Sequence, residues 1–128
     1  MTDSGRFSDN LCRLTKPIGG IFNFSGSGVG TFIHGNTESG ALSAHYCAWS
    51  GLDTISSVAH PRNSITMALS VTSHDYGTPC NLLPTKTHFT VSSGTGRFAN
   101  ATGGGSVVFT CDFRANTYTD KWSGTITF

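Results

Sequence analysis

Residues 64–72 read Ser-Ile-Thr-Met-Ala-Leu-Ser-Val-Thr, and an apolar side chain occupies every second position of this stretch. Ile65, Met67, Leu69 and Val71 alternate with small or polar residues, which is the pattern of a strand with one buried face. An amphipathic helix would instead repeat its apolar residues every three or four positions. The stretch therefore predicts a β-strand that turns these four side chains toward a core.

The same two-residue period recurs on both sides of this stretch. It predicts further strands at 22–24, 29–34, 41–49, 88–91, 107–113 and 121–128. Clusters of Gly, Asn, Asp, Ser and Pro separate the runs and are typical of turns. These clusters predict turns at 35–36, 51–53, 60–63, 74–79, 92–96, 100–105 and 115–116.

Seven or eight short strands with little room for a helix predict an all-β domain over residues 1–128, with 1–10 as an N-terminal arm. The composition agrees, because 16 glycines and a single glutamate, Glu38, do not suit long surface helices. Closing the sheet removes exposed edges, so we expect one antiparallel β-barrel of about eight strands. A β-sandwich is the alternative. An eight-stranded barrel has an interior that side chains fill or that holds one small ligand.

The charge distribution argues against nucleic acid as a partner. Lys and Arg number 8 against 7 Asp and Glu, and the basic residues are scattered singly rather than gathered in a stripe. No run reaches the roughly 18 apolar residues of a membrane helix, so we expect a soluble protein without membrane insertion. The first residues lack the apolar segment of a signal peptide, which indicates a cytoplasmic protein as the sequence is given, or a secreted one if a leader was removed.

The cysteines leave the redox state open. Cys12, Cys47, Cys80 and Cys111 are widely spaced, without the Cys-x-x-Cys pair of a zinc knuckle or a thioredoxin-type site. Two disulfides are compatible with this spacing, in any of three pairings. We expect no metal site and no cofactor.

Two glycine-rich stretches superficially resemble phosphate loops. Gly26–Gly30 and Gly94–Gly96 both lead into a predicted strand, whereas a dinucleotide fingerprint opens a helix. Glycines at turns and bulges that curve strands into a barrel explain both stretches better.

A family resemblance enters at residues 94–105, which read Gly-Thr-Gly-Arg-Phe-Ala-Asn-Ala-Thr-Gly-Gly-Gly. This stretch resembles the hairpin of the allene oxide cyclase-like barrels, a group that includes plant dirigent proteins and small bacterial proteins. Residues 122–128 are similar to the closing strand of those bacterial proteins, and residues 28–35 match one of their strands weakly. The resemblance covers the last third of the chain. It implies an eight-stranded barrel whose lumen binds an apolar or phenolic molecule, and in some branches cofactor-free cyclisation.

Three residues are candidates for proton transfer. His45 and Tyr46 lie in an otherwise apolar strand, and a histidine exchanges protons near neutral pH. Glu38 is a candidate to steer a developing cation. The alternatives are that His45 is hydrogen-bonded on the outer surface and that Glu38 caps a solvated turn.

An apolar set could line a binding pocket, although simple core packing explains it equally well. Its members are Phe22, Phe24, Met67, Leu69, Phe89, Phe109 and Trp122. Asp53 and residues 60–62 are expected in a loop at a barrel mouth, where binding residues often collect. His74 and Asp75 are adjacent and so point to opposite faces of a strand.

Three functions follow as hypotheses. The first is a cofactor-independent cyclase or isomerase that holds a hydrophobic polyene, polyketide-like or phenolic substrate in one folded conformation. The second is a non-catalytic carrier of a lipophilic ligand, and the third is a secreted, disulfide-stapled structural barrel with a filled interior. The sequence is also compatible with a homo-oligomer. A cavity of several hundred Å³ would favour the first two hypotheses.

Overall fold

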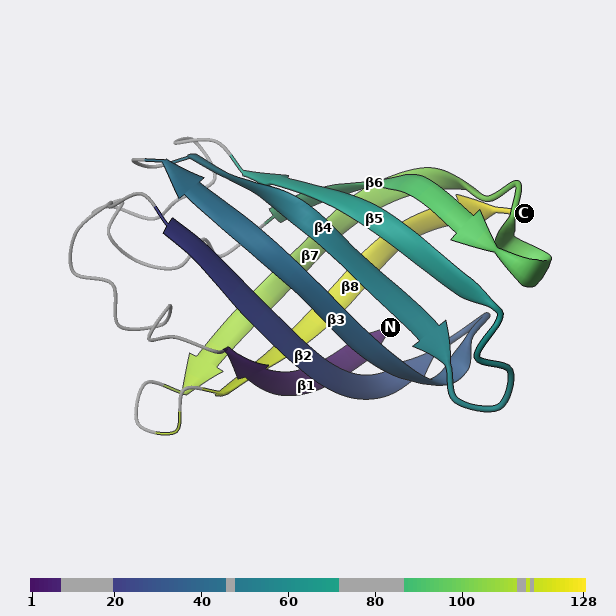
Figure 1. Cartoon of the computed structure of the whole chain (residues 1–128), viewed down its shortest axis with the longest axis horizontal. Coiled ribbons are helices and arrows are strands. Elements are labelled where there is room, and N and C mark those ends of the chain that lie inside the picture. The colour runs from purple at the N-terminus through teal and green to yellow at the C-terminus, as the bar shows by residue number, and fades with distance from the viewer. Residues whose placement is uncertain (8–19, 46–47, 72–86, 113–114, 116) are drawn as a thin grey trace.

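Eight antiparallel strands pair each with its neighbour in sequence, and the first also pairs with the last, which closes a barrel (Figure 1). The computed structural model describes residues 1–7, 20–45, 48–71, 87–112, 115 and 117–128. The predicted closed barrel is confirmed, and the β-sandwich alternative is wrong. The strands are β1 (Thr2–Phe7), β2 (Gly20–Gly30), β3 (His34–His45), β4 (Ala48–Ser57), β5 (Ser64–Val71), β6 (Thr87–Thr95), β7 (Thr102–Asp112) and β8 (Thr117–Thr127).

Strand β5 follows its sequence pattern. Ile65, Met67 and Leu69 are buried, whereas Ser70 on the opposite face is exposed. The register with β6 shifts between Thr66 and Met67, which is a bulge of the kind that bends a strand around a barrel. The two-residue period therefore identified both the strand and its inner face.

Two of the predicted turns lie inside strands. Gly35 and Asn36 belong to β3, and the stretch 51–53 belongs to β4. Gly51 is required by close packing of strands, since a Cβ built on it would lie 1.8 Å from the carbonyl oxygen of Ala41. Asn36 and Asp53 are buried in the lumen instead of facing water in a turn. Their residue types indicated turns, but here they supply polar groups to the barrel interior.

The expected single strand at 41–49 is also wrong. Strand β3 ends at His45 and β4 begins at Ala48, with these two residues paired across the hairpin. Apolar alternation runs through both arms, and the sequence between them has no Gly, Pro, Asn or Asp to signal a turn.

The N-terminal arm expected at 1–10 instead begins with strand β1, which lies between β2 and β8. The pattern missed this strand because its inner positions carry Asp3 and Gly5, not apolar side chains. Pairing with β2 and β8 satisfies the backbone groups of β1. Its pairing with β8 closes the barrel.

The connection from β6 to β7 differs in detail from the predicted turns at 92–96 and 100–105. Strand β6 continues to Thr95, a short 3₁₀ helix η3 (Gly96–Phe98) follows, and β7 begins at Thr102. Gly96 has a φ of +59°, a conformation that favours glycine. The predicted turn at 60–63 is confirmed. The backbone N–H of Arg97 donates to Asn63 Oδ1 at 3.1 Å, so this turn contacts the connection from β6 to β7.

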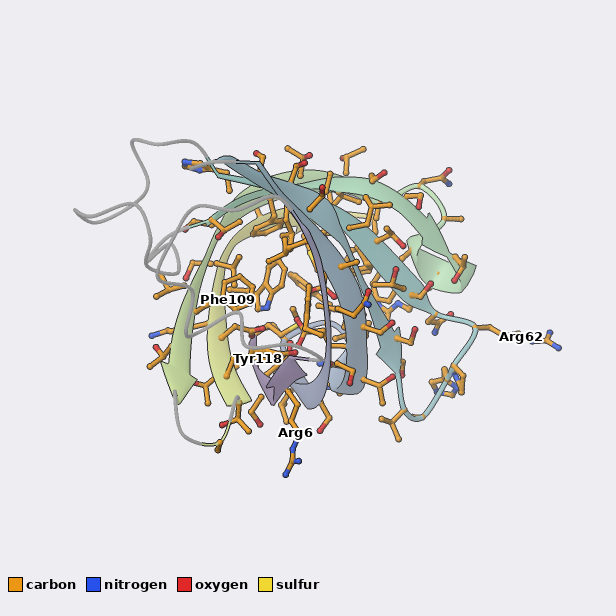
Figure 2. The ribbon with its side chains drawn as sticks, turned by 60° about the vertical axis from the view of Figure 1, so that its left-hand side comes forward. Arg6, Arg62, Phe109 and Tyr118 are labelled. Carbon is orange, nitrogen blue, oxygen red and sulfur yellow. The ribbon has the colours of Figure 1, made fainter. Side chains whose placement is uncertain are left out.

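The core fills the lumen, and charged side chains such as Arg6 and Arg62 point away from it while Phe109 and Tyr118 point inward (Figure 2). Phe24, Phe109 and Tyr118 make edge-to-face contacts with ring centroids 5.8–6.3 Å apart. No helix among the described residues is long and apolar enough to cross a membrane.

Candidate functional site

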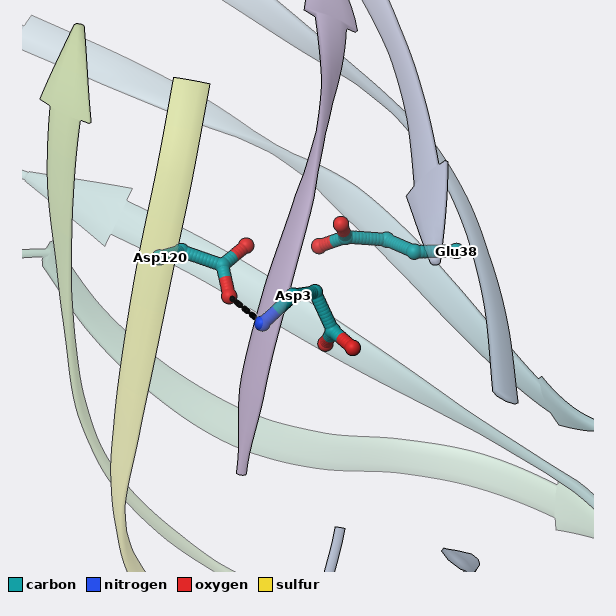
Figure 3. A group of neighbouring side chains, drawn as sticks. All are labelled: Asp3, Glu38 and Asp120. Atoms are coloured by element: carbon teal, nitrogen blue, oxygen red, sulfur yellow. Dashed lines mark hydrogen bonds between the residues drawn. The ribbon is translucent and has the colours of Figure 1, made fainter. Parts of the chain in front are cut away.

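A cluster of carboxyl groups lies inside the barrel. Asp3 of β1, Glu38 of β3 and Asp120 of β8 bring carboxylate oxygens within 4.8 Å of one another (Figure 3). Asp53 of β4 is buried beside them. These side chains are at most 2% exposed. Four acidic groups in one lumen are unusual, because burying a charge without a partner is costly.

Strand register places the cluster, and glycines make room for it. Asp3 is the cross-strand partner of Asp120 on one side and of Gly28 on the other. Glu38 lies opposite Gly26. A Cβ at Gly28 would lie 1.8 Å from Asp3 Oδ1, so only glycine leaves space for that carboxyl group in this arrangement.

Few hydrogen-bond donors reach the carboxyl oxygens. The Tyr118 hydroxyl donates to Glu38 Oε2 at 2.6 Å. The backbone N–H of Asp3 and the indole N–H of Trp122 both donate to Asp120 Oδ1, at 3.1 and 2.8 Å. Glu38 and Asp120 are thereby held in place by groups on β8 and β1.

Burial is the main cause of a raised pKa at all four acids. It raises the pKa of Asp3 to about 6 and that of Asp53 to about 7. The pKa of Glu38 rises to about 9 through burial and the nearby charge of Asp53, and that of Asp120 to about 9 through burial and the charge of Glu38. The pKa of Tyr118 is also raised, first by burial and then by Glu38.

With pKa values of about 9, Glu38 and Asp120 keep their protons at neutral pH. A protonated carboxyl group carries an O–H that can donate a hydrogen bond or a proton, which an ionised surface carboxylate cannot do. The interior of the barrel thus holds two carboxylic acids in their neutral form.

A pocket of about 220 Å³ lies at the end of the barrel where β2 turns into β3. Its walls are mostly apolar, and the sequence-predicted residues Met67, Phe89 and Trp122 are among them. The remaining lining residues are Met1, Gly30, Thr31, Phe32, Ile33, Ile55, Ile65, Ser123, Gly124 and Ile126. Phe32 and Ser123 are exposed, so the pocket reaches the surface on that side.

Two contacts join the pocket to the carboxyl cluster. Trp122 forms part of the pocket wall while its indole N–H is bonded to Asp120. Ile55, another wall residue, is the cross-strand partner of Glu38, and both side chains face the lumen. Glu38 and Asp120 therefore lie beside residues of the pocket wall without lining the pocket themselves.

The three residues predicted to transfer protons meet different outcomes. Glu38 is buried in the lumen, so its alternative role as the cap of a solvated turn is wrong. The side chain of His45 and all of Tyr46 lie outside the described part of the chain, as do His74 and Asp75.

The predicted pocket residues divide into two groups. Met67, Phe89 and Trp122 line the pocket, whereas Phe24, Leu69 and Phe109 are buried in the core without lining it. The side chain of Phe22 lies outside the described residues, together with the side chains of all four cysteines.

Sequence reasoning missed most of the carboxyl cluster. Asp53 was expected in a loop at a barrel mouth with residues 60–62. Residues 60–62 are exposed between β4 and β5, but Asp53 is 0% exposed in the lumen. Asp3 was assigned to an arm, and Asp120 and Tyr118 were not singled out. One signal was available: in β8, residues 118, 120 and 122 share a face, and the last of them was predicted to point inward.

The fold and site together define a closed eight-stranded barrel with an apolar pocket at one end and a buried group of carboxylic acids behind it. Comparison of the chain with protein-family models, with curated proteins and with solved structures finds no match in any of the three.

Proposed function

We propose that this protein binds a compact hydrophobic molecule in its barrel and acts on it as a cofactor-independent cyclase or isomerase. The observation that carries the proposal is the apolar pocket of about 220 Å³ with Met67, Phe89 and Trp122 in its wall. A cavity of about 150 Å³ lined by apolar side chains is large enough for benzene, and drug-sized pockets begin near 300 Å³. The expected ligand is therefore a monocyclic or short-chain compound.

The wall of the pocket supports recognition by shape. Thr31 and Ser123 are the hydroxyl side chains in the lining, and both are exposed at its rim. A ligand in the interior of the pocket therefore meets mainly hydrocarbon and aromatic surface. A barrel of this kind accelerates a reaction by holding one folded conformation of its substrate away from water.

The carboxyl cluster supports a catalytic role over simple storage. Glu38, which the sequence indicated as a candidate for proton transfer, has a pKa raised to about 9 and lies beside Ile55 of the pocket wall. A neutral acid can donate a proton to a carbon–carbon double bond or a carbonyl group that comes within hydrogen-bond reach of it, directly or through one water. Membership of the allene oxide cyclase-like group, suggested by residues 94–105, belongs to the same proposal.

The pocket is tested by ligand capture. The protein is incubated with a set of monocyclic terpenes, phenols and short polyenes, and retained compounds are identified by native mass spectrometry. The variant Ile126→Phe adds volume at the pocket lining and should abolish retention. Val108→Phe places the same side chain on the exposed outer face of β7 and should leave retention unchanged.

Catalysis is tested on whichever compound is retained. Product analysis by chromatography should show an isomer of the same mass, and Glu38→Gln should slow its formation while affinity changes little. Retention without conversion would support the carrier hypothesis instead. Equal retention by wild type and Ile126→Phe would refute the pocket as the binding site.

A further inference from the structure

Seven buried oxygen atoms around the carboxyl cluster have no hydrogen-bond partner among the described residues. They are Asp3 Oδ1 and Oδ2, Asn36 Oδ1, Glu38 Oε1, Asp53 Oδ1 and Oδ2, and Asp120 Oδ2. Leaving a buried polar group unsatisfied costs about 1–3 kcal/mol, and more for a charged group. Seven such atoms in one place therefore need either protons or a cation.

The donors near these atoms are already used. Tyr118 donates to Glu38 Oε2, and the indole N–H of Trp122 donates to Asp120 Oδ1. The side-chain N–H of Asn36 donates to the carbonyl oxygen of His34 at 3.3 Å. Protons on Glu38 and Asp120 would serve up to four of the seven oxygens, two that carry the protons and two that accept from them, so they would not serve them all.

The spacing of the carboxylates suits one metal ion. Oxygens of Asp3, Glu38 and Asp120 lie within 4.8 Å of one another. Calcium binds oxygen at about 2.3–2.6 Å, so two ligands on opposite sides of one ion are about 4.6–5.2 Å apart. Magnesium binds at about 2.0–2.1 Å, which limits that separation to about 4.2 Å. Oxygens within 4.8 Å of one another are compatible with the calcium separation. A buried set of several protein carboxylates also suits calcium better than magnesium, which usually keeps several waters.

Two further buried side chains from outside this trio point to the same place. Asp53 is 0% exposed with both oxygens unpartnered, and it lies close enough to Glu38 for its charge to raise the pKa of that group. Asn36 is 1% exposed, its Oδ1 is unpartnered, and its amide lies beside the carboxyl group of Asp3. All five side chains offer oxygen, the atom that hard divalent cations prefer.

We propose that this barrel binds a divalent cation of calcium's size between Asp3, Glu38 and Asp120, with the unpartnered oxygens of Asp53 and Asn36 buried beside the site. None of these five residues lines the apolar pocket, so cation and ligand occupy separate sites. Binding of the cation displaces protons from the carboxyl groups.

The test is calorimetric titration of calcium chloride into protein stripped with a chelator and dialysed, with magnesium chloride as the comparison. Because the ligands are at most 2% exposed, each sample is equilibrated long enough for the barrel to open transiently. We expect one calcium ion per chain, weaker binding of magnesium, and a higher melting temperature in calcium. No heat and no thermal shift would overturn the proposal, as would tighter binding of magnesium.

Variants locate the site. Removing even a hydrogen-bond partner of a metal ligand weakens affinity about 10- to 100-fold. Asp120→Asn keeps the acceptor for Trp122 but loses the charged ligand, so calcium affinity should fall by about 100-fold or more. Asp3→Asn should behave alike. Thr119→Val, next in sequence but exposed on the outer face, should bind calcium as wild type does.

A second readout separates this site from the pocket. Terbium, which occupies calcium sites, should luminesce on excitation of tryptophan in the wild type. Trp122→Phe also removes a hydrogen bond to the ligand Asp120, so it should weaken both that signal and calcium affinity. Calcium binding that is unchanged in Asp120→Asn would overturn the proposed site. Loss of ligand retention in Ile126→Phe concerns only the pocket, so either proposal can fail without the other.

Discussion

The stability of the cation-free barrel should fall as pH rises from 5 to 7, because two buried acids keep protons that the unfolded chain releases. Burial raises the pKa of Glu38 from 4.5 to about 9 and that of Asp120 from 3.8 to about 9. Over this pH range the folded state holds both protons and the unfolded state releases nearly all of them. An acid whose pKa is raised on folding therefore lowers the free energy of unfolding of the protein as the pH increases.

The size of the effect follows from the proton count. Each retained proton changes the free energy of unfolding by about 1.4 kcal/mol per pH unit, so Glu38 and Asp120 give about 3 kcal/mol per unit. From pH 5 to pH 7 these two groups account for a loss of about 5 kcal/mol, and the raised pKa values of Asp3 and Asp53 add to it in the same direction. Since whole domains are stable by about 5–15 kcal/mol, a loss of this size is easily measured.

Urea unfolding, followed by circular dichroism at pH 5, 6 and 7 in the presence of a calcium chelator, measures this slope. Glu38→Gln removes one of the titrating groups and should reduce the slope by about 1.4 kcal/mol per pH unit. Arg6→Gln removes a charge from the outer surface and should keep the wild-type slope. A stability that rises with pH over this range, or a slope that Glu38→Gln leaves unchanged, would refute the assignment of neutral buried acids.

Two smaller changes test the packing of the cluster. Gly28→Ala places a methyl group against Asp3 Oδ1 and should lower the free energy of unfolding by about 1–3 kcal/mol, whereas Gly35→Ala, where nothing lies within 4 Å of a new Cβ, should change it little in the same urea assay. Equal effects of the two would contradict the crowding at Asp3. Tyr118→Phe removes the hydrogen bond that partly lowers the pKa of Glu38, so infrared titration of the carboxyl band should show that pKa rising further, and a fall would contradict the assigned hydrogen bond.

The architecture could be predicted because most strands keep apolar residues on alternate positions. Ile65, Met67 and Leu69 show this directly, and their inward face was identified from the sequence. Strand β1 could not be found in this way, since its inner positions are Asp3 and Gly5. A strand whose buried face is polar gives no hydrophobic period.

The carboxyl cluster escaped prediction for a related reason. Asn36 follows Gly35 directly and Asp53 lies two positions after Gly51, and such combinations are typical of turns in water. In the barrel, the glycines permit close approach of strands and the polar side chains turn inward. Glu38 was singled out because it is the one glutamate of the chain, but its neighbours Asp3 and Asp120 are 117 residues apart and only strand closure brings them together.

The pairing of β1 with β8 has a consequence for how the protein folds during synthesis. The bond from the Asp3 backbone to Asp120 spans nearly the whole described chain, so it cannot form until β8 has left the ribosome. Closing so long a loop carries a large entropic cost, and sheets built on distant contacts fold slowly. The acidic side chains therefore stay hydrated and ionised on the nascent chain, and their protonation or capture of a cation accompanies the last step of assembly.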